Sequence, residues 1–179
     1  MLIDALESNG KLKVAELRAL YQSYSNDPRL AQDIAEAVAS GDETLEQNGG
    51  VLLKDFLESG RDFSEEQWEI VIDSLSPKIH WTCRLNLCHA FVVYPRLLER
   101  DKIALSSFLH DAIQDKNAFL RAWAISAFWA LADLDSDYAD EAMEYREHGL
   151  KENAASVCAR MLPLERHGNR LVDKQFKRP

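Results

Sequence analysis

Helix-start signals recur at nearly equal intervals along this sequence of 179 residues. Asp27, Ser64, Asp101 and Asp137 are residue types that accept hydrogen bonds from the first backbone N–H groups of a helix, and they stand 37, 37 and 36 residues apart. Each interval holds two helical stretches joined by a short break. One helix pair of this length cannot bury its apolar face alone, whereas stacked pairs can. The spacing predicts a helical solenoid, and an accidental rhythm in an ordinary helical bundle is the alternative.

No stretch of the sequence shows a periodicity other than that of a helix. Only 7 Gly and 5 Pro occur among the 179 residues, which disfavours a turn-rich β-sandwich or barrel. We therefore predict an all-α fold, an α-α superhelix of about four helix pairs with terminal helices, in a single domain spanning residues 1–179. Its expected parts are N-terminal capping helices (1–26), helix-pair repeats (27–162) and a basic C-terminal helix or tail (163–179).

Three glycines bear on the expected helices. Gly49 and Gly50 fall inside a helical stretch from Leu45 to Leu57, where they either break the helix or let a neighbouring helix approach closely. Gly149 is expected to end the helix that begins near Asp137.

The second helices of two successive units are similar residue by residue. The eight residues from Arg84 to Phe91 align at an offset of 37 with those from Arg121 to Phe128, and Arg, Ala and Phe are identical in register. Here the sequence resembles HEAT repeats, a family of helix-pair solenoids related to armadillo repeats. The second helix of a HEAT repeat typically carries Asp, then Arg six positions later, then Ala and Ala followed by an apolar residue. The matching residues are Asp115, Arg121, Ala124, Ala127 and Phe128.

The resemblance implies a structural role for Asp115, Arg121 and Arg84. An Asp in the turn between two helices can cap backbone N–H groups while it accepts a charge-assisted bond from Arg in its own or the next unit. Lys78 stands where the earlier unit should carry this Asp, so Arg84 lacks that partner. The segments around Arg84 and Arg121 are also similar to small uncharacterised bacterial proteins of this HEAT-like type.

In solenoids of this family the second helices line the concave surface, which implies where a partner would bind. The corresponding positions form a strip beside the apolar stripe of each helix, and in the earlier unit this strip is distinctly more polar than its core neighbours. The strip residues that we predict to contact a partner are His89, Arg96, Ser126, Trp129 and Asp133.

Two clusters of potential metal ligands have simpler explanations. The run from Asp133 to Asp137 imitates part of an EF-hand loop, but Tyr138 stands where that loop needs Gly. His80 and Cys83 lie three residues apart, yet zinc would need two further ligands. Helix capping and ordinary helix-face positions account for both clusters, so we predict neither a metal nor a cofactor.

The N-terminus and the cysteines indicate the compartment. Acidic residues near Met1 argue against a secretory signal, and the longest weakly polar stretch is shorter than a membrane span. The three cysteines form neither an even framework nor a CxxC pair. We predict a cytoplasmic protein with reduced thiols and no association with membranes.

Charge separates two hypotheses about function. The net charge is −9, although residues 151–179 carry seven basic and three acidic side chains. The lack of any known catalytic motif makes an enzyme the less favoured class and favours a noncatalytic scaffold that binds a protein or peptide. The alternative is a DNA-binding protein similar to the HEAT-like DNA glycosylases that act on alkylated bases. The acidic body disfavours it, because such a protein needs several phosphate-neutralising residues along its groove.

Overall fold

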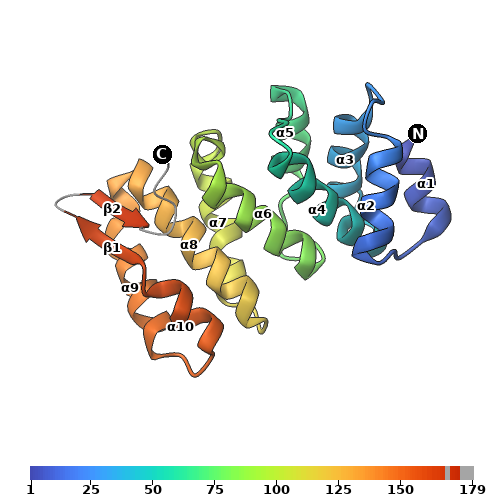
Figure 1. Cartoon of the computed structure of the whole chain (residues 1–179). Helices are drawn as coiled ribbons and strands as arrows, with labels where there is room; N and C mark the ends of the chain where they lie inside the picture. The colour runs from blue at the N-terminus through green and yellow to red at the C-terminus, as the bar shows by residue number, and fades with distance from the viewer. Residues whose placement is uncertain (168–169, 174–179) are drawn as a thin grey trace. The chain divides into compact units, whose positions relative to one another are not determined.

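The computed structural model describes residues 1–167 and 170–173, with side chains through residue 164 (Figure 1). The described chain is predominantly α-helical, so the predicted all-α class is confirmed for its body. Its α-helices are α1 (Leu2–Asn9), α2 (Val14–Ser23), α3 (Leu30–Val38), α4 (Glu43–Glu58), α5 (Glu65–Asp73), α6 (Trp81–Val93), α7 (Lys102–Ile113), α8 (Ala118–Leu134), α9 (Ala139–Lys151) and α10 (Ala155–Met161). Two 3-10 helices, η1 (Pro95–Glu99) and η2 (Ser136–Tyr138), and two strands, β1 (Leu164–His167) and β2 (Arg170–Asp173), complete them.

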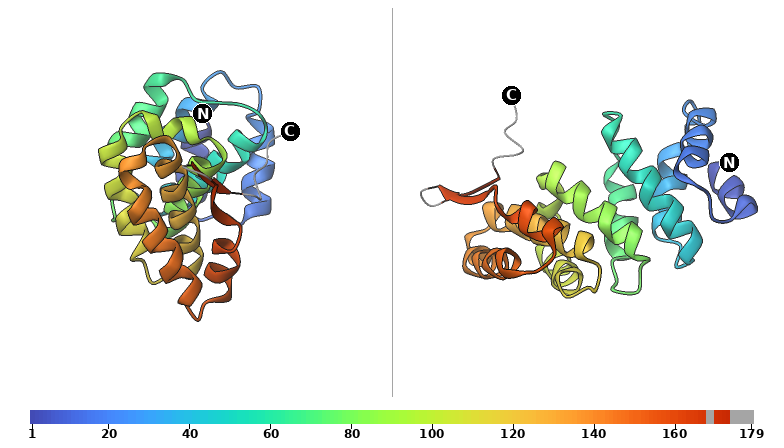
Figure 2. Two further views of the ribbon diagram at one scale, coloured as in Figure 1. Left: turned by 90° about the vertical axis from the view of Figure 1, so that its left-hand side faces the viewer. Right: turned by 60° about the horizontal axis from the view of Figure 1, so that its bottom comes forward.

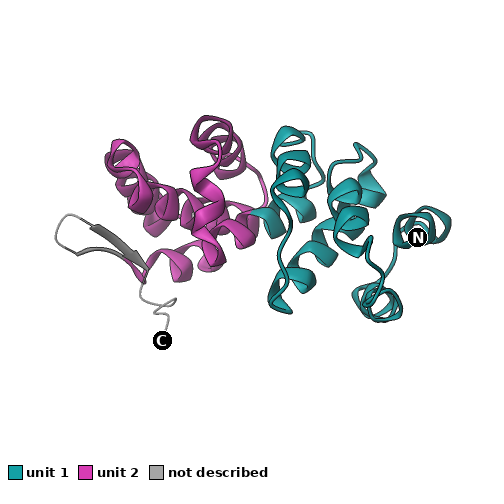
Figure 3. Ribbon diagram, turned by 90° about the horizontal axis from the view of Figure 1, so that it is seen from above, with its two compact units in different colours: residues 1–87 teal, residues 88–179 magenta. Residues whose placement is uncertain are grey.

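The chain consists of two compact units, unit 1 from Met1 to Leu87 and unit 2 from Cys88 to Pro179 (Figure 3). Helix α6 begins in unit 1 and ends in unit 2. None of the helices within the described ranges is both long and apolar enough to cross a lipid bilayer.

Local capping explains where several helices begin. Ser64 forms a capping box, in which its hydroxyl accepts from the N–H of Gln67 and the Gln67 side chain accepts from the N–H of Ser64. Asp101 caps α7. Asp137 instead lies within η2, and α9 begins after Tyr138. Two of the four start signals, Ser64 and Asp101, therefore cap a helix directly, whereas Asp27 and Asp137 lie three and two residues before the first residue of α3 and α9.

In unit 1, successive helix pairs contact one another. Helix α3 packs on α4, α1 contacts α3, α2 contacts α4, and α3 also contacts α5. The α4 helix is continuous through Gly49 and Gly50, which selects the second of the two roles considered for them. A Cβ atom on Gly49 would lie 2.9 Å from the backbone nitrogen of Val38, and one on Gly50 would lie 2.6 Å from the Cα of Cys83. Only glycine allows these backbones to approach so closely.

In unit 2, α8 is the central helix. It contacts α7, α9, α10, both 3-10 helices and β2, and Figure 2 gives two further views of these elements. Its buried residues lie on nearly every side of the helix and include Ala124, Ile125, Phe128 and Trp129. A helix that is apolar all round is typically enclosed by neighbours.

Gly149 does not end its helix, contrary to expectation. It lies inside α9, where an added Cβ would be 2.7 Å from the Cγ of Met161 and 3.2 Å from a methyl of Val157. The close packing of α9 on α10 therefore explains this glycine.

The C-terminal segment differs from the expected helix or tail. Strands β1 and β2 form an antiparallel pair, with Leu164 opposite Asp173 and His167 opposite Arg170. Pro163 cannot continue α10 as a regular helix, and a Gly-Asn pair separates the strands in the sequence, as in many hairpins. Residues 174–179 of the predicted tail lie outside the described residues.

Candidate functional site

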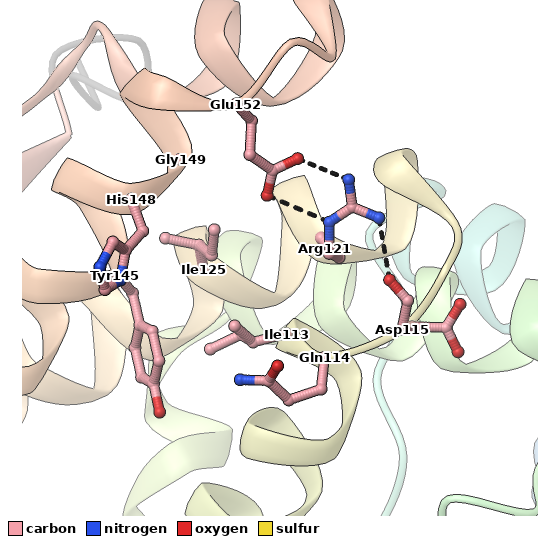
Figure 4. A pocket seen from close by; sticks show the side chains of 9 residues that line it. All are labelled: Ile113, Gln114, Asp115, Arg121, Ile125, Tyr145, His148, Gly149 and Glu152. Carbon is pink, nitrogen blue, oxygen red and sulfur yellow. Dashed lines mark hydrogen bonds and ion pairs between the residues drawn. The ribbon is translucent and has the colours of Figure 1, made fainter.

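Unit 2 contains a pocket of about 480 Å³ where the C-terminal ends of α7 and α9 approach the N-terminal half of α8 (Figure 4). Its size falls in the range of small-ligand sites. Its lining residues are Ile113, Gln114, Asp115, Arg121, Ile125, Tyr145, His148, Gly149 and Glu152.

Arg121 lies at the rim of this pocket and is bonded to residues on both sides of it. Its Nε donates to Oε1 of Glu152 at 3.1 Å and its Nη2 donates to Oε2 at 2.5 Å, a bidentate arrangement that raises the pKa of Arg121 (Figure 4). Its Nη1 donates to the backbone carbonyls of Asp115 and Lys116 at 2.9 and 3.0 Å. Arg121 thus joins the α7–α8 turn to the end of α9.

Asp115 caps the α7–α8 turn and is bonded to Arg121 through its main chain, and its predicted structural role stays a prediction. The carboxylate of Asp115 accepts the N–H of Asn117 at 2.8 Å, as expected of a residue that caps this turn. The main-chain carbonyl of Asp115 accepts a bond from Arg121, and the carboxylate of Glu152 accepts two more from the same guanidinium. Nothing local in the sequence indicates Glu152, because it lies 31 residues further along the chain.

Arg84, the third predicted structural residue, is buried on α6 in unit 1 with 4% of its surface exposed. Its N–H donates to the carbonyl of His80 at 3.1 Å. Its structural role stays a prediction.

Tyr145 forms one wall of the pocket and is held in place by three neighbours. Its hydroxyl lies 2.7 Å from Nδ1 of His110 and donates to Oε1 of Glu141 at 2.8 Å. Its ring meets that of Phe128 edge-on, with the centroids 5.2 Å apart. Burial, followed by the bond to Glu141, raises the pKa of Tyr145 above its ordinary value of 10.0. These contacts fix the orientation of the ring.

Two residues of the predicted contact strip are buried instead of exposed. Trp129 and Ser126 each expose 2% of their surface. The Ser126 hydroxyl donates to the carbonyl of Ala122 and accepts from Nε of Arg160 at 2.8 Å. The prediction that Ser126 and Trp129 contact a partner is therefore wrong, because η1, α10 and β2 contact α8 as well as α7 and α9.

The other three strip residues lie on three different elements. Arg96 is exposed on η1, whereas Asp133 is half-buried near the end of α8. His89 lies against α8, where its ring meets the Trp123 indole at a centroid distance of 4.5 Å. The roles of these three residues stay predictions.

The structure adds residues that were not among the predicted contacts. The Arg160 guanidinium lies over the Trp123 ring, 3.8 Å from its centroid, so the indole contacts both Arg160 and His89. Phe119, one helical turn before Trp123, is 62% exposed. We call His89, Phe119, Trp123 and Arg160 the aromatic surface. The i, i+4 spacing of Phe119 and Trp123 was the available sequence signal.

The two clusters of potential metal ligands have other contacts. Asp135 accepts from Nζ of Lys102 at 2.8 Å and from the N–H of Asp137 at 3.2 Å. His80 Nδ1 accepts the N–H of Thr82 at the start of α6. Within the described ranges, no three His, Cys, Asp or Glu side chains gather in a way that could hold a metal ion.

Comparison of the chain with known protein families, curated proteins and solved structures finds no significant match.

Proposed function

We propose that this chain is a noncatalytic module that binds a protein or peptide, and that the aromatic surface of unit 2 is a contact site. The observation that carries the proposal is the exposure of Phe119 beside Trp123. Large aromatic side chains supply much of the binding energy at protein interfaces. An exposed ring adjoining an ordered one therefore favours partner binding over a purely structural role.

The ordering of Trp123 supports the proposal further. Arg160 covers one face of the indole and is bonded to the buried hydroxyl of Ser126, while His89 contacts the ring edge-on. A side chain already held in place loses little conformational entropy when a partner binds. The surface thus combines a fixed aromatic group with an adjacent exposed one.

The contacts between successive helices of unit 1 support the proposed HEAT-like superhelix. In unit 1, α1 and α2 contact α3 and α4 respectively, which is the neighbour pattern of stacked helix pairs. We include this architecture and a cytoplasmic location in the proposal. The DNA-binding alternative depends mainly on basic residues after position 164, whose side chains lie outside the described part of the chain.

Affinity capture from host extracts tests the function. The full chain, Phe119→Ala and the control Ile103→Ala are compared, with and without nuclease. Ile103 is 79% exposed on α7 and does not belong to the aromatic surface, so its substitution removes a similar apolar group elsewhere in unit 2. We expect a near-stoichiometric protein to be captured by the wild type and by Ile103→Ala but lost with Phe119→Ala.

Two outcomes would contradict the proposal. Retention of the same partner by Phe119→Ala, with native circular dichroism in all variants, would remove the aromatic surface from binding. Capture that depends on nucleic acid and disappears after nuclease treatment would favour the DNA-binding alternative.

A further inference from the structure

We infer that His80 is a pH-sensitive cap on helix α6. The neutral imidazole holds the first turn of this helix, and uptake of a second ring proton releases that turn. His80 and the first turn of α6 belong to unit 1, so this device does not include the aromatic surface of unit 2. Its basis is the hydrogen bonding of His80, which determines where each ring proton can lie.

His80 directly precedes α6 and bonds its first turn in two ways. Its carbonyl accepts the N–H of Arg84 at 3.1 Å, the first bond of the helix. Its Nδ1 accepts the N–H of Thr82 at 3.2 Å. The first N–H groups of a helix have no partner within the helix, so the imidazole satisfies a donor that the backbone of α6 cannot. A nitrogen that accepts a hydrogen bond carries no proton, so neutral His80 carries its proton on Nε2.

A second proton on His80 can bind only Nδ1. The charged imidazole has two donors and no acceptor, so the N–H of Thr82 would face another N–H. The positive charge would also lie at the N-terminal end of α6, where the helix dipole disfavours it. Histidine commonly takes up this proton between about pH 5 and 8. Mild acid therefore removes the side-chain cap of α6.

Two carboxylates of α4 face His80 and give the charged ring other partners. Oε1 of Glu43 lies 3.7 Å from Nε2 of His80, and Oε2 of Glu46 accepts the His80 N–H at 2.7 Å. Glu46 is buried, whereas the side chain of Glu43 is 83% exposed. Along its own segment His80 has two basic neighbours, Lys78, which is exposed, and Arg84. The carboxylates attract the charged ring toward α4 at the same time as its bond to α6 is lost.

The first turn of α6 carries residues whose surroundings depend on its position. Trp81 is 44% exposed, and its ring centroid lies 5.8 Å from that of His80. Cys83 lies so close to α4 that a Cβ atom on Gly50 would be 2.6 Å from its Cα. Release of this turn should therefore loosen the start of α6 against α4.

His110 is an internal control, because its Nδ1 has the opposite role. The single hydroxyl proton of Tyr145 is donated to Glu141 at 2.8 Å, so the 2.7 Å contact between that hydroxyl and Nδ1 of His110 requires a proton on Nδ1. A second proton on His110 would bind Nε2 and leave this bond in place. Acid should weaken the bond made by His80 and preserve the bond made by His110.

Nuclear magnetic resonance of the isotopically labelled full chain tests both roles between about pH 8 and 5. Long-range proton–nitrogen spectra report which ring nitrogens are protonated. We expect the proton of the neutral ring on Nε2 in His80 and on Nδ1 in His110. As His80 becomes charged, the protection of the Thr82 amide against hydrogen exchange should fall by about fivefold, the loss expected for an ordinary helix cap.

Two variants identify the group responsible. His80→Asn keeps a capping side chain that does not titrate, so the Thr82 amide should stay protected over the whole range. His148→Asn removes an exposed histidine of α9 and should leave the response of Thr82 unchanged. The spectra of the ring nitrogens use the unaltered chain, and they decide the question even if His80→Asn fails to fold.

Four results would overturn the inference. The first is a proton on Nδ1 of neutral His80. The second is an unchanged protection of the Thr82 amide while His80 is doubly protonated. The third is a His80 ring that takes up no second proton down to about pH 5. The fourth is the same loss of Thr82 protection in His80→Asn, which would assign the loss to another titrating group.

Discussion

A Cβ atom placed on Gly50 would lie 2.6 Å from the Cα atom of Cys83 and 3.0 Å from its Cβ atom. The first of these neighbours is backbone, which no change of rotamer can move away. Helices α4 and α6 are therefore held at a separation that excludes every other residue at position 50.

We expect Gly50→Ala to lower the free energy of unfolding by about 1–3 kcal/mol, although alanine is the better helix former by about 1 kcal/mol. Urea denaturation followed by circular dichroism measures the change. Gly149→Ala is the comparison, because its nearest atoms belong to the flexible side chain of Met161. It should destabilise less, and a larger effect there than at Gly50 would contradict this explanation.

Arg121→Lys should destabilise the protein by about 1–2 kcal/mol, because lysine cannot form the two parallel bonds to Glu152 and also reach the two carbonyls of the α7–α8 turn. Arg18→Lys is the matched control. Arg18 is bonded to Asp55, but its side chain is 60% exposed, so the same substitution should leave stability unchanged. Equal losses of stability in the two variants would show that the bonds of Arg121 stabilise the protein no more than the exposed ion pair of Arg18 does.

The Lys102–Asp135 pair should give an acid-dependent contribution to stability. The bond from Lys102, with a smaller effect from the Asp137 N–H, holds the pKa of Asp135 below its ordinary value of 3.8. A carboxyl with a lowered folded-state pKa stabilises the fold above its ordinary value, and this contribution is lost as pH falls through the folded-state value. Lys102→Met should therefore destabilise at neutral pH, and its effect should vanish in strong acid.

Carboxyl-detected NMR titration checks this directly, since Lys102→Met should raise the pKa of Asp135 toward 3.8. Lys54→Met removes an equal charge from a lysine paired with Glu58 and should not change the Asp135 titration. An unchanged Asp135 titration in Lys102→Met would mean that the ion pair does not persist in solution.

Tyr145 should stay protonated at about pH 11, where a tyrosine with ordinary pKa is mostly ionised. Burial and the bond to Glu141 raise the pKa of Tyr145 above its ordinary value of 10.0. The neutral form of Tyr145 therefore stabilises the fold below that ordinary pKa, and this contribution is lost as the pH rises through the folded-state pKa. Ultraviolet titration of native Tyr145→Phe should show the same ionisation amplitude at about pH 11 as the wild type. A smaller amplitude in the variant would show that Tyr145 is already ionised at about pH 11.

Helix starts that depend on bonds between residues close together in the sequence could be predicted. The helix starts at Ser64 and Asp101 depend on bonds within three residues, and both appear as expected. The pocket was not predictable in this way. The contacts of Arg121 with Glu152 and of His110 with Tyr145 join residues 31 and 35 positions apart, with no local pattern to connect them.

The error at Trp129 has a similar cause. Its position on a strip beside the apolar stripe of α8 is correct, but its exposure depends on which elements cover that strip. The local pattern of residues 118–134 does not show that η1, α10 and β2 also contact this helix.

The central position of α8 has a consequence for biosynthesis. Its apolar sides are buried partly by α7, which precedes it, and partly by α9, α10 and β2, which follow it. When the ribosome has just released Leu134, the surfaces that will cover Trp123 and Ser126 have not yet been made. Unit 2 therefore cannot reach its final form until translation has passed β2, and a nascent chain stalled after α8 would present a helix with uncovered apolar sides to chaperones.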